Sequence, residues 1–338
     1  MKYKSVVATK RGGPEVLQIV ENELRPPRAR EARINVLATS VGRTDIHYRY
    51  GVSPLSPKTP FVPGYEILGV VDAVGEGVTS AGVGDRVAAL TGHGGYAETI
   101  YLGQEHLVHV PTTLDPAEAV TLILNYVTAH QMLHRTAQVK AGDKTLVIGA
   151  SGGVGTALLQ LGKVADLTMY GTASRSKHGV LAKLGATPID YRNEDFVARI
   201  NEETAGRGVD AVFDTIGGKY WSRSYQCVAR GGILVAFGAM QLTTGEERVP
   251  SLLWGFFKLF ALWPLIPDGR ATTFYNIQTR REKEPAQFKQ DVATLFEMLR
   301  AGKLKPALQD VVPLADVVSV HRQIDKALIA GKVVFNCE

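Results

Sequence analysis

A strand, a glycine-rich loop and a helix follow one another directly near the middle of the chain. The apolar, partly β-branched residues 145–148 lead into a loop at 149–155, and a helical stretch begins at 156. The glycines allow backbone amides to approach a pyrophosphate, and the helix N-terminus adds partial positive charge. In this context the loop predicts a dinucleotide-binding site rather than a tight turn without a ligand.

The loop departs from the usual glycine pattern at its first position. Ala150 and Ser151 precede Gly152, so the motif reads Ala-x-Gly-x-x-Gly. The two later glycines remain, and these govern close approach to the cofactor and packing of the helix. The residues predicted to bind the cofactor here are Ala150, Ser151, Gly152, Gly153, Val154 and Gly155.

The end of the second predicted strand indicates which nicotinamide cofactor is used. An NAD site usually places an acidic residue there, about 20 residues beyond the loop, to bind the ribose hydroxyl. Residues 171–178 contain no acid, whereas Ser174, Arg175 and Lys177 offer a hydroxyl and two cations. An ordinary basic loop would look similar, but its position at a strand end favours the 2′-phosphate of NADPH.

The sequence pattern differs between the first part of the chain and the rest, and 338 residues are too many for one ordinary hydrophobic core. Residues 1–120 carry short apolar runs broken by glycine and proline, which predict a small, partly open β-barrel. From 144 onward strands alternate with helices, which predicts an α/β domain with a doubly wound parallel sheet. The predicted elements are barrel strands at 32–38, 69–74, 85–89, 96–101 and 107–110; sheet strands at 145–148, 167–172, 210–214 and 232–237; helices at 153–164, 177–184 and 220–229; an edge strand at 274–277; a helix at 285–301; and a strand, helix and strand at 307–314, 315–330 and 332–335.

Charge and cysteine content exclude several classes of protein. The net charge of +5 arises from 38 basic and 33 acidic residues without a basic run, so no nucleic-acid partner is expected. Only Cys227 and Cys337 are present, which excludes a disulfide framework and fits a reducing, cytoplasmic setting. Residues 1–7 resemble a first strand rather than a signal peptide.

An apolar segment at 252–263 is the most unusual stretch. It is shorter than the roughly 20 residues that span a bilayer, and Lys258 interrupts it, so a transmembrane helix is not expected. We expect a buried helix or a dimer contact. A lid over an apolar substrate, or a membrane-docking patch with Trp254 and Trp263 at the interface, remains an alternative.

Short motifs along nearly the whole chain resemble one superfamily. Residues 63–71 match the GxExxGxV signature of medium-chain dehydrogenases/reductases, and the five-residue phrase at 125–129 is similar to relatives of synaptic vesicle membrane protein VAT-1. The other matching phrases are typical of the zinc-independent quinone oxidoreductase (zeta-crystallin) branch. They lie at 75–78, 84–87, 152–155, 189–191, 207–210, 214–218 and 331–334.

The resemblance implies a particular domain arrangement and cofactor site. A GroES-like β-barrel catalytic domain would comprise residues 1–124 and 285–338, and a Rossmann NADP-binding domain residues 125–284, with the cofactor in the cleft and dimers or tetramers as the common assembly. It implies that Ser174 and Tyr191 hold the 2′-phosphate and that Thr128 lies near the nicotinamide. Ile216, Phe237 and Gly238 would complete the cofactor site.

Zinc ligands are missing where zinc-dependent relatives carry them. Those enzymes have Cys in a Cys-x-Thr-Asp motif and His in a Gly-His-Glu motif, but Gly42 and Tyr65 occupy these positions. The four-cysteine lobe is also missing. The pairs His130/His134 and His106/His109 lack a third ligand in the sequence, so no metal site is predicted.

Without a Lewis acid, oxidation of simple alcohols is disfavoured, whereas reduction of a quinone or an enone needs less assistance. The developing oxygen anion would need a proton or hydrogen-bond donor. Quinone reductases often carry Asn at position 42 and Tyr at position 47, so the departures here leave the acceptor open. Tyr65, His47, Tyr50 and Asn125 are the candidate catalytic residues, with Tyr48 and water as further possibilities.

Two other functions remain open, and one is excluded. No tyrosine has lysine four residues later, which excludes a short-chain dehydrogenase. An NADPH-binding protein with little or no turnover, as among crystallins and VAT-1-like proteins, is an alternative. An enoyl-thioester reductase is another.

Overall fold

The chain forms two compact units. The computed structural model describes residues 1–53, 55–239, 249–326, 328–329 and 331–337. Unit 1 comprises Met1–Val127 with Arg281–Glu338, and unit 2 is the continuous segment Thr128–Arg280. Unit 1 is therefore built from both ends of the chain.

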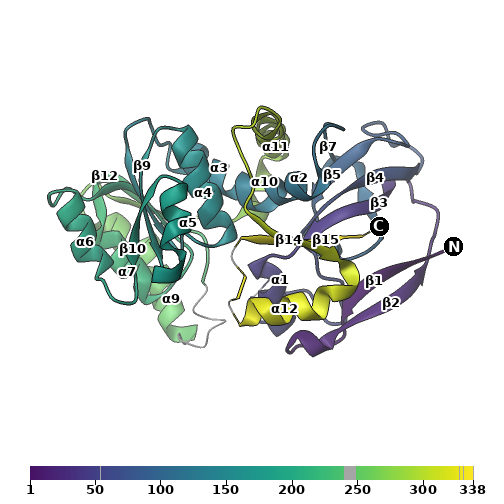
Figure 1. The fold of residues 1–338 in the computed structure, drawn as a ribbon, viewed down its shortest axis with the longest axis horizontal. Coiled ribbons are helices and arrows are strands. Elements are labelled where there is room, and N and C mark those ends of the chain that lie inside the picture. The colour runs from purple at the N-terminus through teal and green to yellow at the C-terminus, as the bar shows by residue number, and fades with distance from the viewer. Residues whose placement is uncertain (54, 240–248, 327, 330, 338) are drawn as a thin grey trace. The chain divides into compact units, whose positions relative to one another are not determined.

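Unit 2 contains a six-stranded parallel sheet (Figure 1). Along the sheet the order is β10-β9-β8-β11-β12-β13, so the first strand of the unit, β8, lies in the middle beside the fourth, β11. In doubly wound sheets of this strand order, ligands generally bind at the carboxyl ends of the strands, at the point where the strand order reverses. The strands are β8 (Lys144–Ile148), β9 (Thr168–Ala173), β10 (Ala186–Asp190), β11 (Val209–Asp214), β12 (Val228–Ala236) and β13 (Ala271–Phe274).

Helices cover both faces of this sheet, which explains why its central strands are almost entirely apolar. Figure 1 shows α4 and α5 on one face, and α6, α7 and α9 pack together on the other. Trp221 of α7 is fully buried in the core against strand residues such as Leu146 and Val212. The helices are α3 (Val127–His130), α4 (Gly153–Val164), α5 (His178–Lys183), α6 (Phe196–Glu203), α7 (Lys219–Gln226), α9 (Val249–Phe257) and α10 (Ile277–Lys283), with shorter turns η4 (Gln131–Thr136), η5 (Arg175–Lys177), η6 (Lys258–Leu262) and η7 (Trp263–Leu265).

Unit 1 is organised around one long strand, β3. It pairs with β4, β6 and β15, and two register shifts against β4 bend it, so the seven-stranded sheet curls into a partial barrel. The strands of the unit are β1 (Lys2–Ala8), β2 (Leu17–Glu23), β3 (Glu31–Ser40), β4 (Glu66–Val74), β5 (Arg86–Leu90), β6 (Thr99–Gly103), β7 (Val108–His109), β14 (Leu308–Pro313) and β15 (Lys332–Asn336). The predicted α/β class with a GroES-like barrel and a Rossmann sheet is confirmed.

The helices of unit 1 cover the ends of this sheet. The helix α1 begins after Gly42, whose backbone N–H donates to the Asp45 carboxylate, and ends at the left-handed Gly51. The helices are α1 (Arg43–Tyr50), α2 (Pro116–Thr121), α11 (Pro285–Arg300) and α12 (Val317–Asp325), with turns η1 (Pro14–Val16), η2 (Gln104–His106), η3 (Leu122–Tyr126) and η8 (Leu314–Asp316).

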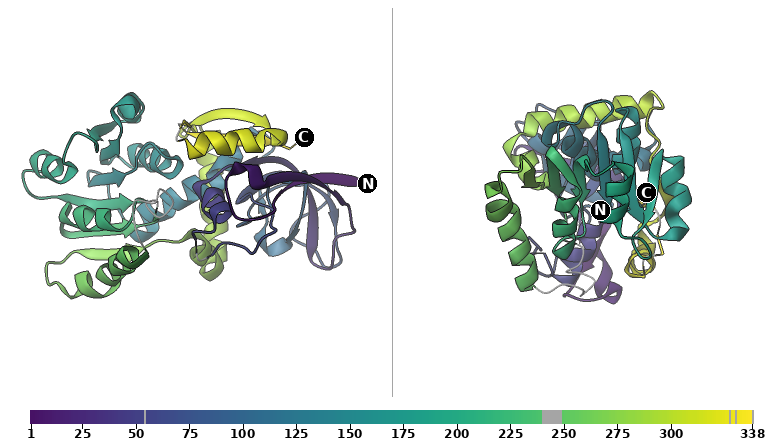
Figure 2. Two further views of the ribbon diagram at one scale, coloured as in Figure 1. Left: turned by 90° about the horizontal axis from the view of Figure 1, so that it is seen from below. Right: turned by 90° about the vertical axis from the view of Figure 1, so that its left-hand side faces the viewer.

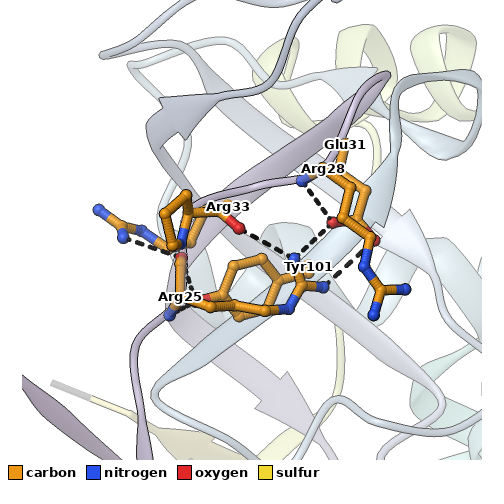
Figure 3. Close-up of polar contacts among 6 residues, drawn as sticks. Arg25, Arg28, Glu31, Arg33 and Tyr101 are labelled. Carbon is orange, nitrogen blue, oxygen red and sulfur yellow. Dashed lines mark hydrogen bonds and ion pairs between the residues drawn. The ribbon is translucent and has the colours of Figure 1, made fainter.

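A polar cluster fixes the chain where it enters β3 (Figure 3). The Glu31 carboxylate accepts from the Arg25 guanidinium at 2.7 Å and from the Arg28 backbone N–H at 2.9 Å. The Tyr101 hydroxyl donates to the Arg25 carbonyl, and the guanidinium of Arg25 lies 3.9 Å from the ring centre. These contacts fix the segment that contains Pro26 and Pro27 before β3.

Two predictions about the end of unit 2 need correction. The edge strand is Ala271–Phe274, earlier than the predicted 274–277, because Ile277 already begins α10. The apolar segment is only partly core. Leu259 and Trp263 are buried, but the opposite side of α9 and η6, in the light-green part of Figure 2, presents large apolar side chains to solvent. No helix among the described residues has the length and apolar character to cross a membrane.

Candidate cofactor and active site

The loop between β8 and α4 has the shape that a dinucleotide requires. Gly149 has φ +80°, and its N–H donates to the Thr172 hydroxyl at 3.0 Å, which ties the loop to the neighbouring strand. A Cβ on Gly155 would lie 2.6 Å from the Gly149 carbonyl oxygen, so only glycine allows α4 to approach the loop this closely. The first N–H groups of α4 have no intrahelical acceptor and can bind an anion.

The ends of β9 and β10 supply the groups predicted for a 2′-phosphate. Ser174 directly follows β9, and its hydroxyl lies 3.3 Å from that of Ser176. Arg175 is exposed and Lys177 half-buried, so their cationic ends are accessible. Tyr191 directly follows β10 and is 41% exposed. The paired strands β9 and β10 therefore bring these side chains to one edge of the sheet.

A buried carboxylate shapes the loop after β11, which carries Ile216. Asp214 accepts from the Ile216 N–H at 2.7 Å and from the Ser224 hydroxyl at 2.6 Å. Burial raises the pKa of Asp214 to about 6, although these hydrogen bonds oppose the shift. The Phe237 N–H donates to the Asp214 carbonyl, so this one residue arranges the ends of both β11 and β12.

The Thr128 side chain of unit 2 is almost entirely buried. The residue is 5% exposed, and its hydroxyl oxygen is buried without a partner among the described residues. Buried polar atoms are normally hydrogen-bonded, so an orphaned hydroxyl indicates a missing ligand. Together with the glycine loop, this atom fits a bound nicotinamide cofactor.

In unit 1, two buried carboxylates join the segments that carry the candidate catalytic side chains. Asp45 of α1 accepts from the backbone N–H of Gly64 at 2.9 Å, which ties α1, with His47, to the segment that contains Tyr65. Burial raises the pKa of Asp45 to about 6, despite donors at Gly42 and Gly64 and the nearby charge of Lys332.

Glu66 provides the second connection. Its Oε2 accepts from the Leu124 backbone N–H at 2.6 Å, which joins the segment of Tyr65 to that of Asn125. Its Oε1 accepts from the Ser40 hydroxyl and lies 3.1 Å from the Lys332 ammonium. The carboxylate is fully buried, so this ion pair is almost entirely removed from water.

The four candidate catalytic side chains differ in their surroundings. Tyr65 is 4% exposed, with its ring centre 6.0 Å from that of Tyr48. Burial, and then the charge of Arg43, lower the pKa of His47 to about 4, so its imidazole is neutral near pH 7. Tyr50 is more exposed, and its hydroxyl already donates to Asp325 at 3.1 Å. Asn125 is 6% exposed.

A further buried network extends from α1 to α12. The Arg49 guanidinium contacts Nδ1 of His321 at 2.9 Å and the carboxylate of Asp325. Nε2 of His321 lies 3.2 Å from the Tyr96 hydroxyl. Burial, and then the charge of Arg49, lower the pKa of His321 to about 3.

The sequence alone does not identify Asp45, Glu66, Asp214 or His321 as structural parts of these sites. Asp45, Glu66 and Asp214 lie within the motifs quoted above, but their contacts became visible only in three dimensions. Across the described residues, no group of three or more His, Cys, Asp and Glu side chains is placed to hold a metal ion.

Two family models match the chain. The alcohol dehydrogenase GroES-like domain matches residues 28–112, and the zinc-binding dehydrogenase domain matches residues 184–335. The first lies within unit 1, and the second includes much of the parallel sheet.

Several characterised proteins are similar over almost the full length. The quinone oxidoreductase of Pseudomonas aeruginosa is 37% identical, with 96% of each chain covered. The VAT-1 homolog of Danio rerio is 30% identical and covers 99% of this chain and 70% of its own. A 2-haloacrylate reductase of a Burkholderia species is 30% identical, with 98% of each chain covered.

Solved structures show the same arrangement of elements. The Escherichia coli quinone oxidoreductase, complexed with NADPH, has a TM-score of 0.85 at 27% identity and covers 98% of this chain and 99% of its own. The CurK enoyl reductase has a TM-score of 0.83 at 27% identity, with 99% of each chain covered.

Proposed function

Because the chain belongs to the quinone oxidoreductase and VAT-1-like branch of the medium-chain dehydrogenase/reductase superfamily, we propose that it is an NADPH-dependent reductase of quinones or α,β-unsaturated carbonyl compounds. The observation that carries the proposal is the set of residues at the end of β9. Ser174, Arg175 and Lys177 lie there, and residues 171–178 include no acidic side chain. The NADPH held by a quinone oxidoreductase of the same fold supports this choice of cofactor.

Bound NADPH would supply a hydride to an electrophilic carbon of the acceptor. The first amides of α4 would hold the pyrophosphate, and Tyr191 with the cations after β9 would hold the 2′-phosphate. The hydroxyl of Thr128 would bond the nicotinamide amide. Tyr65, His47, Asn125 or the more exposed Tyr50 would donate to the acceptor oxygen as negative charge develops there.

The reaction is proposed to proceed without zinc. The residues at the two zinc-ligand positions, Gly42 and Tyr65, offer no thiolate or imidazole. We therefore expect activity to persist in excess EDTA, and the acceptor to be one that is already activated toward hydride.

The first experiment follows the loss of NADPH absorbance in EDTA with benzoquinone, phenanthrenequinone and a medium-chain enone, with NADH in parallel. Oxidation of NADPH in preference to NADH supports the proposed reductase, and the relative kcat/KM values rank quinone against enone. Preference for NADH, or loss of activity in EDTA that zinc restores, contradicts it.

Two alternatives predict different outcomes. Tight NADPH binding without oxidation by any acceptor favours a binding protein with little turnover. Activity confined to enoyl-thioesters favours an enoyl reductase, an alternative supported by the similarity to CurK over almost the full chain.

We also propose that the chain is a cytoplasmic homodimer. The support for a dimer is the row of exposed apolar side chains on α9, η6 and η7, beside the open sheet edge at β13. Monomers seldom expose a contiguous apolar patch of this extent, and an unpaired strand edge favours association.

A further inference from the structure

The helical segment from Pro116 to Thr136 is not a regular α-helix. It begins as α2, widens into the π-helical turn η3 over Leu122–Tyr126, resumes as α3 and ends in a second π-helical turn, η4. Within η3 the Val127 N–H donates to the Leu122 carbonyl, five residues back. A π-turn inserts one extra residue into a helix and usually has an identifiable cause.

The cause here is the side chain of Glu66, the first residue of β4. Its Oε2 takes the Leu124 N–H at 2.6 Å, and in a regular helix that N–H would donate to the carbonyl four residues back. The other oxygen is fixed by the Ser40 hydroxyl and by Lys332, so the carboxylate cannot turn away. The Glu66 side chain thus inserts into the helix from β4. Glu66 and Leu124 are 58 residues apart in sequence.

The extra residue changes which way the following side chains face. One residue corresponds to about 100° of helix rotation, so Asn125 and the residues after it point elsewhere than in a continuous α-helix. Asn125 directly follows Leu124 and is one of the candidate donors to the acceptor oxygen. A change in its orientation would misplace that donor.

Stability alone does not account for this arrangement. A regular helix would satisfy the Leu124 N–H without help, and a buried ion pair such as Glu66–Lys332 is seldom a net gain over apolar packing. We propose that Glu66 is a positioning residue, whose carboxylate holds η3 open and so orients Asn125 toward the acceptor. This inference rests on the proposed reductase function for its kinetic consequence, but its structural part can be tested without turnover.

The test compares Glu66→Gln with a matched control, Thr39→Val. The Thr39 hydroxyl is fully buried and donates to the backbone carbonyl of the same Glu66 at 2.7 Å, so its removal disturbs the same place without touching the carboxylate. If Glu66→Gln fails to fold because Lys332 is left unpaired, the double variant Glu66→Gln/Lys332→Gln removes both charges together.

In the proposal, Glu66→Gln lowers kcat at least about tenfold, since small misplacements of reacting groups are costly, while the dissociation constant of NADPH changes less than about threefold. In NMR spectra of Glu66→Gln protein labelled at leucine and asparagine, we expect the resonances of the Leu124 backbone amide and the Asn125 side-chain amide to shift. Thr39→Val leaves kcat and both resonances near their wild-type values.

Either of two results overturns the proposal: unmoved Leu124 and Asn125 resonances in Glu66→Gln, or a fall in kcat no larger than in Thr39→Val. If the wild-type chain reduces no acceptor, that result contradicts the proposed reductase function but not the structural role of Glu66. In that case the NMR comparison alone tests whether the Glu66 carboxylate positions Asn125.

Discussion

We propose that the side chains after β9 decide which nicotinamide cofactor is preferred. Replacing both Arg175 and Lys177 with Ala should raise the KM for NADPH about 10- to 100-fold and leave that for NADH little changed, because charge-assisted contacts to a phosphate contribute about 1.5–3 kcal/mol. Steady-state kinetics with both cofactors measures the effect. Lys183→Ala, an exposed lysine at the end of α5, is the control. An equal loss with NADH would contradict the assignment.

Gly155 allows α4 to pack closely against the cofactor loop. Gly155→Val should abolish detectable NADPH binding and lower the melting temperature, since its Cβ would lie 2.6 Å from the Gly149 carbonyl oxygen and 2.7 Å from Ala150. Gly179→Ala on α5 is the control, because a Cβ there meets nothing within 4 Å and removes flexibility from the unfolded chain. Fluorescence titration with NADPH and thermal unfolding test both variants. Normal binding by Gly155→Val would refute the packing argument.

Local chemistry explains which residues could be predicted from the sequence. The loop at Gly152–Gly155 requires only its own strand and helix, so its pattern is visible in consecutive residues. The contact of Glu66 with Leu124 spans 58 residues, and that of Asp45 with Gly64 spans 19. Contacts between residues so far apart in the chain leave no periodic pattern in the sequence. The roles of the candidate site residues accordingly remain predictions, whereas the family and the fold class are confirmed.

At the scale of elements, tertiary contacts override local preference in two places. The π-turn η3 exists because a side chain from β4 enters the helix, and its own residues Leu122–Tyr126 carry no signal for it. The edge strand β13 pairs along Ala271–Phe274, where the Thr272 hydroxyl also donates to the Leu259 carbonyl. The aromatic and apolar residues that predicted a strand at 274–277 lie at the end of β13 and the start of α10.

The apolar face of α9 and η6 gives a prediction at this scale. Leu253, Phe257 and Phe260 are 62%, 51% and 58% exposed, on one side of the helix. Replacing all three with Ser should weaken dimerisation at least about 100-fold, since buried aromatic anchors dominate interfaces. Sedimentation velocity over a range of concentrations measures this, with Val164→Ser/Val180→Ser as a control on exposed residues elsewhere. A wild-type chain that stays monomeric at every concentration would contradict the dimer.

At the scale of the whole molecule, burial shifts the pKa values of two histidines in unit 1 and of one carboxyl group in unit 2 in opposite directions. In unit 1 the pKa of His47 is lowered to about 4 and that of His321 to about 3, both chiefly by burial. In unit 2 the pKa of Asp214 is raised to about 6, also by burial. Asp45 of unit 1 has the same upward shift as Asp214 and offsets part of the histidine effect.

The sign of each effect follows from which state binds the proton first. The unfolded chain protonates the histidines near pH 6.5, before the folded chain does, so their contribution to stability is lost as pH falls below that value. The folded chain protonates Asp214 before the unfolded chain does, so unit 2 gains stability as pH falls from about 6 to about 3.8. The shifts in the pKa values of His47, Asp214 and His321 each correspond to about 3 to 5 kcal/mol at most.

Unit 1 should therefore open first when pH is lowered from about 6.5 to about 4. Hydrogen exchange followed by mass spectrometry resolves the units, and we expect protection in β3 and β4 to fall while protection in β8 and β11 is kept or rises. His321→Gln can keep the contacts to Arg49 and Tyr96 without titrating, so it should reduce the acid sensitivity of unit 1 alone. Equal loss of protection in both units, or acid sensitivity unchanged in His321→Gln, would show that other groups control acid unfolding.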